Sequence, residues 1–161
     1  MKTNIIYTRR TLLGGAAALF VGAASVPAFA QATVTPSVTA EKVTLFKDPN
    51  CGCCQGYADY LTENGFEVEV IPTEVLGQIT TDAGIPEDFA GCHIFNIADY
   101  AFSGHIPLAI LTKFLVERPA MIGLTVPGMP LGSPGMGGEK TEPLKVFAVE
   151  AGQTPTVYAV E

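Results

Sequence analysis

The spacing of apolar and polar residues along the chain predicts an α/β fold. Residues 43–46 form a short apolar run that ends at Asp48-Pro49-Asn50, which is typical of a strand followed by a turn. Residues 66–70 alternate apolar and acidic side chains, as in a strand with one buried face. The strands that these patterns predict lie at residues 43–46, 66–70, 94–97, 100–106, 144–149 and 156–160.

Three helices are expected between these strands. Apolar residues recur at helical spacing from residue 55 to 64, and a glycine follows as the stop. A second helix can begin at a Thr73 cap and is broken at Gly84-Ile85-Pro86, and a third opens at Pro107 and ends by Pro119. The order β-α-β-α-β-β-α is the thioredoxin-like arrangement, in which a reactive dithiol loop joins the first strand to the first helix.

The N-terminus has the layout of an export signal. Residues 1–30 contain basic residues, then an apolar stretch, then the cleavage pattern Ala28-Phe29-Ala30, and Thr8-Arg9-Arg10-Thr11-Leu12-Leu13 resembles a twin-arginine signal. A membrane anchor is disfavoured, because the apolar run is short for a spanning helix and no cysteine follows the cleavage site to take a lipid. We expect export to the periplasm, a flexible lead-in at 31–41 and one domain at 42–161.

The charge of the chain disfavours two classes of partner. The signal carries three basic residues and no acidic one, so its removal would change the net charge from −7 to −10. A protein this acidic is not expected to bind nucleic acid or an anionic membrane surface. The same acidity is also the ordinary surface of a soluble exported protein, and it adds at most a weak attraction for cations.

Three of the four cysteines lie in Cys51-Gly52-Cys53-Cys54, and the fourth is in Cys92-His93. A disulfide framework is not expected, because such bonds join distant segments and a bond between neighbouring cysteines would close a strained ring. At a helix N-terminus the free N–H groups and the helix dipole favour thiolate over thiol. Cys51 and Cys54 have the redox spacing C-x-x-C, whereas the additional Cys53 favours a metal site.

Cys92 and His93 directly precede the third predicted strand. In thioredoxin-like folds this position lies against the dithiol loop, so Cys92 could complete a sulfur-rich pocket. Oxidoreductases of that fold usually carry a cis-proline here, and this chain has Ala90-Gly91-Cys92-His93 instead. The loss of the proline and the gain of two ligand side chains favour coordination over disulfide exchange.

Ligand softness then selects the metal. Thiolate and thioether select Cu(I), zinc or iron–sulfur clusters, and imidazole adds copper and zinc. Copper fits an exported protein best, several thiolates could bridge more than one Cu(I), and zinc bound by three cysteines and a histidine is the main competitor. An iron–sulfur cluster normally uses more widely spread cysteines.

The histidines and two methionines are candidate additional ligands. His93 is expected to be a ligand because it adjoins Cys92, whereas His105 is equally well explained as a structural residue. Met129 and Met136 lie in the stretch 126–138, whose proline and glycine content excludes regular structure. Each could be a thioether ligand or lid, or a plain loop residue.

Four motifs together resemble a known family. They are Lys47-Asp48-Pro49-Asn50-Cys51-Gly52-Cys53-Cys54, Gly91-Cys92-His93, Ser103-Gly104-His105-Ile106-Pro107 and the stretch from Val126 to Met136. In this order they are similar to the periplasmic copper-resistance proteins of the CopG type, formerly known only as a domain of unknown function and unrelated to the ribbon-helix-helix repressor of that name. The resemblance implies a thioredoxin-like fold and Cu(I) binding through the cysteines and a histidine.

The sequence therefore predicts a periplasmic copper-binding protein that takes part in copper tolerance, with metal binding rather than catalysis as its main role and copper redox chemistry as an open addition. The expected partners are copper ions and other periplasmic copper-handling proteins. The expected ligands are Cys51, Cys53, Cys54, Cys92, His93, His105, Met129 and Met136. The alternative is a thiol-disulfide oxidoreductase using Cys51 and Cys54, and a structural zinc module is disfavoured because a domain of this size needs no metal to fold.

Overall fold

The strands and helices of the computed structural model follow the predicted order, and the structure describes residues 41–161. The strands are β1 (Lys42–Lys47), β2 (Glu67–Pro72), β3 (His93–Ile97), β4 (Tyr100–Ser103), β5 (Gly123–Thr125), β6 (Lys145–Val149) and β7 (Thr156–Val160). The helices are α1 (Gly52–Glu63), α2 (Leu76–Asp82) and α3 (Leu108–Glu117), with the 3-10 turn η2 (Glu87–Phe89). The expected signal at 1–30 and nearly all of the lead-in at 31–41 lie outside the described residues.

All seven strands belong to one sheet in the order β2-β1-β3-β4-β5-β6-β7. β1 pairs with β2 in parallel and with β3 antiparallel, and β3 pairs with β4 antiparallel. This is the thioredoxin-like arrangement that the sequence predicted, and the predicted C-terminal strand pair is present as β6 and β7. The α/β fold class is therefore confirmed.

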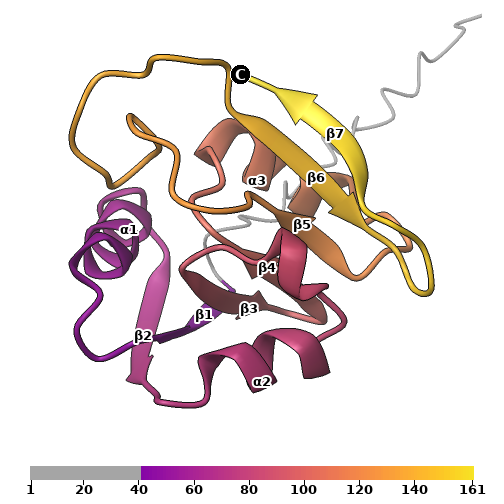
Figure 1. The fold of residues 1–161 in the computed structure, drawn as a ribbon, viewed down its shortest axis with the longest axis horizontal. Helices are drawn as coiled ribbons and strands as arrows, with labels where there is room; N and C mark the ends of the chain where they lie inside the picture. The colour runs from indigo at the N-terminus through magenta and orange to yellow at the C-terminus, as the bar shows by residue number, and fades with distance from the viewer. Residues whose placement is uncertain (1–40) are drawn as a thin grey trace, which may run out of the picture. The chain divides into compact units, whose positions relative to one another are not determined.

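Strand directions bring several connections to one end of the sheet (Figure 1). Lys47 of β1 pairs with His93 at the start of β3, and Ser103 at the end of β4 pairs with Thr125 at the end of β5. We call the end of the sheet defined by these four residues the cysteine end, because the cysteine loop begins directly after β1.

Strand β5 was not predicted, and its size explains why. It has only three residues, all buried, so it shows neither alternation nor length. Gly123 at its start permits the pairing with β4, because a Cβ at this position would overlap the backbone of Ala101. This short strand links the thioredoxin-like part to the β6–β7 hairpin.

The helix boundaries differ from the prediction at the cysteine loop. α1 begins at Gly52 rather than at residue 55, with Cys51 as its N-cap, so Cys53 and Cys54 lie in its first turn. The strand predicted over 100–106 ends at Ser103, because Gly104 adopts a positive φ of 76° and turns the chain. Pro107 precedes α3 as predicted, and the Thr73 hydroxyl accepts a hydrogen bond from the Val75 N–H at 3.2 Å, just before α2.

Helices cover both faces of the sheet (Figure 1). α1 and α3 pack on one face around Leu45, Tyr57, Phe95, Phe102 and Phe114, which are all fully buried. α2 covers the other face, where Ile85, Ile94 and Val149 form a smaller cluster. The core therefore holds α1, and with it the cysteine loop, rigidly against β1 and β3.

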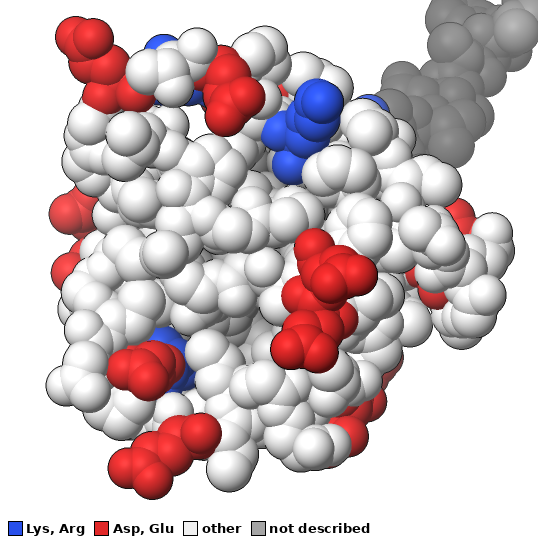
Figure 2. Space-filling view, viewed as in Figure 1, with Lys and Arg blue, Asp and Glu red and all other residues white. Residues whose placement is uncertain are grey.

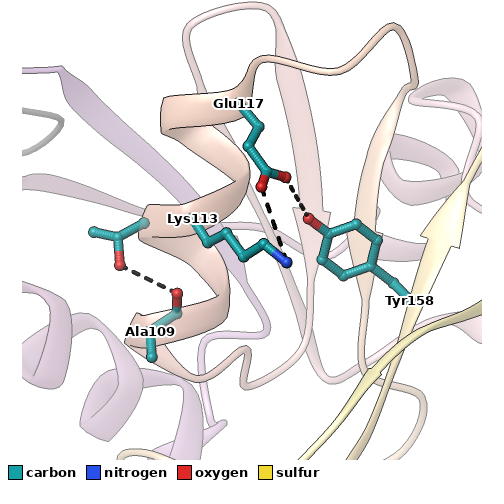
Figure 3. Close-up of polar contacts among 5 residues, drawn as sticks. Ala109, Lys113, Glu117 and Tyr158 are labelled. Atoms are coloured by element: carbon teal, nitrogen blue, oxygen red, sulfur yellow. Dashed lines mark hydrogen bonds and ion pairs between the residues drawn. The ribbon is translucent and has the colours of Figure 1, made fainter.

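The C-terminal hairpin is attached to α3 by polar contacts as well as by packing (Figure 3). The Tyr158 hydroxyl of β7 donates a hydrogen bond to the Glu117 carboxylate at 3.3 Å, and Lys113 lies 3.9 Å from the same carboxylate. The Lys113 ammonium also lies 5.9 Å from the centre of the Tyr158 ring. These groups are largely exposed, so they orient the hairpin more than they stabilise it.

The charged side chains on one face of the protein are mostly acidic (Figure 2). On the face in Figure 2, acidic side chains are spread among uncharged ones, and the few basic side chains among the described residues form no patch there. Within residues 41–161, no helix has the length and apolar character needed to cross a membrane.

Candidate metal centre

The turn after β1 positions the first half of the site. The Asp48 carbonyl accepts a hydrogen bond from the Cys51 N–H at 3.0 Å, and the Asp48 carboxylate accepts one from the Asn50 N–H at 2.8 Å. Cys51 is thereby fixed as the N-cap of α1, and no acidic residue occupies the first turn of this helix. The positive end of the helix dipole therefore acts on sulfur without competition from a carboxylate.

The second half enters at the start of β3. Gly91 allows this approach, because a Cβ there would overlap Gly104, and its N–H donates a hydrogen bond to the Ser103 hydroxyl at 2.8 Å. Cys92 follows, and its Sγ lies 3.6 Å from Cys53 Sγ. As the sequence predicted, Cys92 faces the cysteine loop, and no cis peptide bond occurs within residues 41–161.

The structure joins Cys51 and Cys54 by a disulfide, whereas Cys53 and Cys92 are free. This bond spans three positions within one turn, so it is the C-x-x-C redox pair and not part of a disulfide framework. Cys54 Sγ lies 3.1 Å from the Cys92 carbonyl oxygen, a contact without a hydrogen bond because a disulfide sulfur carries no proton. Both bonded sulfurs become available as thiolate ligands after reduction.

The four sulfurs and the two imidazoles are close enough to share metal ions. The Sγ atoms of Cys51, Cys53, Cys54 and Cys92 form one group, and Cys92 forms a second group with His93 and His105. Within each group the ligand atoms all lie within 4.8 Å of one another. Cys92 belongs to both groups and joins the sulfur ligands to the nitrogen ligands.

His105 has one nitrogen available to a metal. Its Nδ1 lies 2.7 Å from the Pro134 carbonyl oxygen, which can only accept, so Nδ1 carries the proton. Nε2 then presents its lone pair to Cys92 Sγ at 3.3 Å. Burial lowers the pKa of His105 below its usual value, only partly opposed by the Pro134 carbonyl, so the imidazole is neutral and can coordinate.

His93 is fully buried and lies beside the same sulfur. Its Nδ1 is 3.5 Å from Cys92 Sγ, and its Nε2 has no hydrogen-bond partner within the described part of the chain. Burial, followed by the neighbouring His105, holds the pKa of His93 well below its usual value, and the Gly104 carbonyl opposes this shift. A neutral imidazole with an unsatisfied nitrogen fits a metal ligand.

Burial, together with the neighbouring Cys53, raises the pKa of Cys92 to about 12. The general expectation that a helix N-terminus favours thiolate therefore does not extend to this cysteine, which lies just before β3. Since only the thiolate is a strong ligand, a metal ion would have to displace the proton of Cys92. A soft cation with high affinity for sulfur can do so.

The two candidate methionines are placed differently. Met129 Sδ lies 3.8 Å from Cys53 Sγ, although 57% of the Met129 residue surface is exposed. Met136 is partly buried, and its N–H donates to the Ser133 carbonyl at 2.9 Å, but no sulfur contact joins it to the described cysteines. The geometry therefore favours Met129 over Met136 as an additional ligand.

The loop that carries both methionines packs tightly on α1, as the course of the chain between β5 and β6 shows (Figure 1). Gly56 of α1 faces the Gly135 carbonyl so closely that a Cβ at position 56 would overlap it. Gly128 pairs with Gly91 in an isolated parallel bridge, and its N–H donates to the Ala90 carbonyl at 3.1 Å. The glycines of this stretch thus let its backbone lie against the site.

Sequence reasoning missed Tyr57 as a residue of the site. Its ring centre lies 4.8 Å from that of His93 and 5.1 Å from that of His105, and its hydroxyl donates to the Ile106 carbonyl at 2.9 Å. In the sequence, Tyr57 is only one of the apolar residues that recur at helical spacing between residues 55 and 64. Its position one turn after Cys53 was the available signal that its ring would support the histidines.

A cavity of about 750 Å³ lies at the end of the sheet opposite the cysteines. It is lined by the β3–β4 turn at Ala98 and Asp99 and by residues that follow α3, such as Pro119 and Met121. It contains neither cysteine nor histidine, so cavity size does not identify the chemistry of this protein.

Comparisons with known proteins agree with the geometry. Residues 89–136 match a family model described as "Protein of unknown function, DUF411". A solved structure described as copper resistance protein CopG, form 2, is 30% identical over 75% of this chain and 98% of its own, with a TM-score of 0.69. Form 1 is also 30% identical, over 74% and 96%, with a TM-score of 0.68. No curated protein matches the sequence.

Proposed function

The chain belongs to the CopG-type copper-resistance family, and on this premise we propose that it binds Cu(I) at the cysteine end of the sheet and takes part in copper tolerance in the periplasm. One observation carries the proposal: four cysteine sulfurs lie within 4.8 Å of one another, and one of them also contacts two neutral imidazoles. Thiolate, thioether and imidazole together are the ligand set of a soft cation.

Two states of the site follow from the C-x-x-C pair. With the disulfide formed, four ligand atoms remain: the thiol sulfurs of Cys53 and Cys92, the imidazole Nε2 of His105 and the thioether sulfur of Met129. This set suits a single Cu(I). With the disulfide reduced, four thiolates are available and can bridge more than one Cu(I). Zinc competes for such a site, but the thioether and the exported location favour copper.

The disulfide also supports a redox role as an extension of copper binding. Two Cu(II) ions can each take one electron from the Cys51–Cys54 dithiol, which gives two Cu(I) ions, one disulfide and two protons. Cys53 and Cys92 are not in the disulfide, and their Sγ atoms lie 3.6 Å apart, so they could bind the Cu(I) that forms. An external dithiol would have to restore the reduced state.

A thiol-disulfide oxidoreductase is the second candidate, and the Cys51–Cys54 disulfide is the observation that favours it. In that case Cys51, at the N-cap, would be the attacking thiolate and Cys54 the resolving thiol. The replacement of the expected cis-proline by Gly91-Cys92 is unfavourable for it.

The test starts from residues 31–161, purified without oxygen and reduced. We expect Cu(I) to be retained against a chelator with subnanomolar affinity, and Cys53→Ala to lose most of this affinity while its Cys51–Cys54 disulfide still forms. An oxidoreductase would instead tolerate Cys53→Ala and catalyse insulin reduction. Micromolar or weaker Cu(I) binding by the unsubstituted chain, together with insulin reduction, would refute the copper proposal.

A further inference from the structure

Lys47 is a buried cation at the cysteine end of β1. Only 6% of its surface is exposed, and its ammonium donates to the carbonyls of Asp48 at 2.9 Å and Pro49 at 3.3 Å. Within residues 41–161, no carboxylate lies within ion-pair distance of it. A buried ammonium without a negatively charged partner is costly, so its burial here requires an explanation.

The bonds of Lys47 connect it to the first half of the metal centre. The Asp48 carbonyl accepts a hydrogen bond from the Lys47 ammonium, and it also accepts the one from the Cys51 N–H at 3.0 Å. The ammonium and the N-cap of α1 therefore share one acceptor. Displacing the ammonium would remove one of the hydrogen bonds that hold the turn before Cys51.

The strand register connects Lys47 to the second half as well. Lys47 pairs with His93 across β1 and β3, so the two side chains project from the same face of the sheet as close neighbours. His93 in turn contacts Cys92 Sγ at 3.5 Å. Lys47 therefore ends the strand that leads into the first half of the site and lies beside the start of the strand that carries the second half.

The metal-binding state of the site can provide the negative charge that the Lys47 ammonium lacks. When the cysteines release protons to hold Cu(I), negative charge collects on sulfur, while α1 offers only partial positive charge from its N–H groups. We propose that Lys47 is a positioning residue that holds the Cys51 turn and that its positive charge stabilises the anionic sulfurs of the reduced, metal-binding site. This rests on the proposed function, and it assigns a role to a residue outside the ligand set.

Two substitutions separate charge from packing. Lys47→Gln keeps a donor for the carbonyls but removes the charge, and Lys47→Arg keeps the charge. Lys42→Gln is the matched control, because Lys42 lies on the same strand at the other end of the sheet and pairs with Glu69 at the surface. If Lys47→Gln does not fold, Lys47→Met retains the apolar stem and takes its place. Thermal unfolding of each copper-free variant reports folding.

The first measurement is Cu(I) competition with a chelator, using the reduced mature chain at neutral pH without oxygen. We expect Lys47→Gln to weaken Cu(I) binding by about tenfold or more, which corresponds to the loss of one charge interaction close to the site. Lys47→Arg should stay within about threefold of the unsubstituted chain, and Lys42→Gln should not differ from it. Equal Cu(I) affinity of Lys47→Gln and the unsubstituted chain overturns the proposal.

A second measurement uses no copper and keeps the two proposals apart. The equilibrium between the Cys51–Cys54 disulfide and glutathione should move several-fold toward the disulfide in Lys47→Gln, because the reduced form loses its stabilising charge. If the unsubstituted chain does not bind Cu(I), the proposed function fails, and this equilibrium alone decides the role of Lys47. An unchanged equilibrium then overturns the role of Lys47.

Discussion

The packing of the methionine loop on α1 can be tested at a single glycine. In Gly56→Ala the new Cβ would overlap the carbonyl oxygen of Gly135, which is backbone and cannot rotate away as a side chain would. The same substitution improves helix propensity by about 1 kcal/mol. Overpacking of this kind typically costs about 1–3 kcal/mol, so the net effect should be a loss of about 0–2 kcal/mol in the free energy of unfolding.

The loop must move to relieve this overlap, and the site should respond more than the fold. A displaced loop would weaken the bond from His105 to Pro134 and the contact between Met129 and Cys53. We therefore expect weaker Cu(I) binding in the chelator competition and faster proteolytic cleavage of the loop, with the far-ultraviolet spectrum unchanged.

Gly77→Ala is the matched control for the helix effect. Gly77 lies in α2, and a Cβ there meets no atom within 4 Å, so this variant should gain about 0.5–1 kcal/mol in urea unfolding and bind Cu(I) normally. The argument for tight loop packing is refuted if Gly56→Ala is stabilised as much as Gly77→Ala and its Cu(I) affinity and cleavage rate do not change.

Three further outcomes are expected. Met129→Leu should weaken Cu(I) binding several-fold, whereas Met136→Leu should not, since only Met129 contacts a cysteine sulfur; equal titration curves for the two variants would contradict this assignment. Tyr57→Phe should lower the free energy of unfolding by about 1–3 kcal/mol, because the buried Ile106 carbonyl loses its partner, and a value near zero in urea unfolding would contradict the bond. Tyr158→Phe removes only an exposed hydrogen bond and should shift stability by at most about 0.5 kcal/mol in the same assay, so a larger loss would show that the α3–β7 contact matters more than we infer.

The predicted fold was largely correct because most elements are long enough to show their period. The strand at Glu67–Pro72 alternates visibly, and the helix after Pro107 has a clear start. The errors occur where one residue's backbone conformation overrides the pattern, or where a strand is too short to show one. Gly104 ends β4 early through its backbone conformation, and the fully buried three-residue strand beginning at Gly123 has no period to detect.

The residue types of the candidate site were predictable, but their arrangement was not. Sulfur density and the Cys92-His93 pair predict a soft-metal site from residue chemistry alone, and the structure brings these side chains together. Met129 and Met136 are equivalent in sequence, and only the fold of their loop distinguishes them. The proton on His105 depends on a backbone carbonyl, that of Pro134, which no side-chain pattern encodes.

The strand directions also determine where a label, a surface linker or an inserted domain can be attached without covering the cysteines. The turn between β6 and β7, near Gly152, opens at the end of the sheet opposite the cysteines, because β6 runs antiparallel to β5. Gly152 itself has a positive φ of 71°, which disfavours a side chain at that position, but its neighbours Ala151 and Gln153 are exposed. A fluorophore, a surface linker or an inserted domain at this turn would therefore leave the sulfur site open to solvent, whereas a tag on Glu161 would sit beside Leu144, at the end of the sheet where the metal is expected.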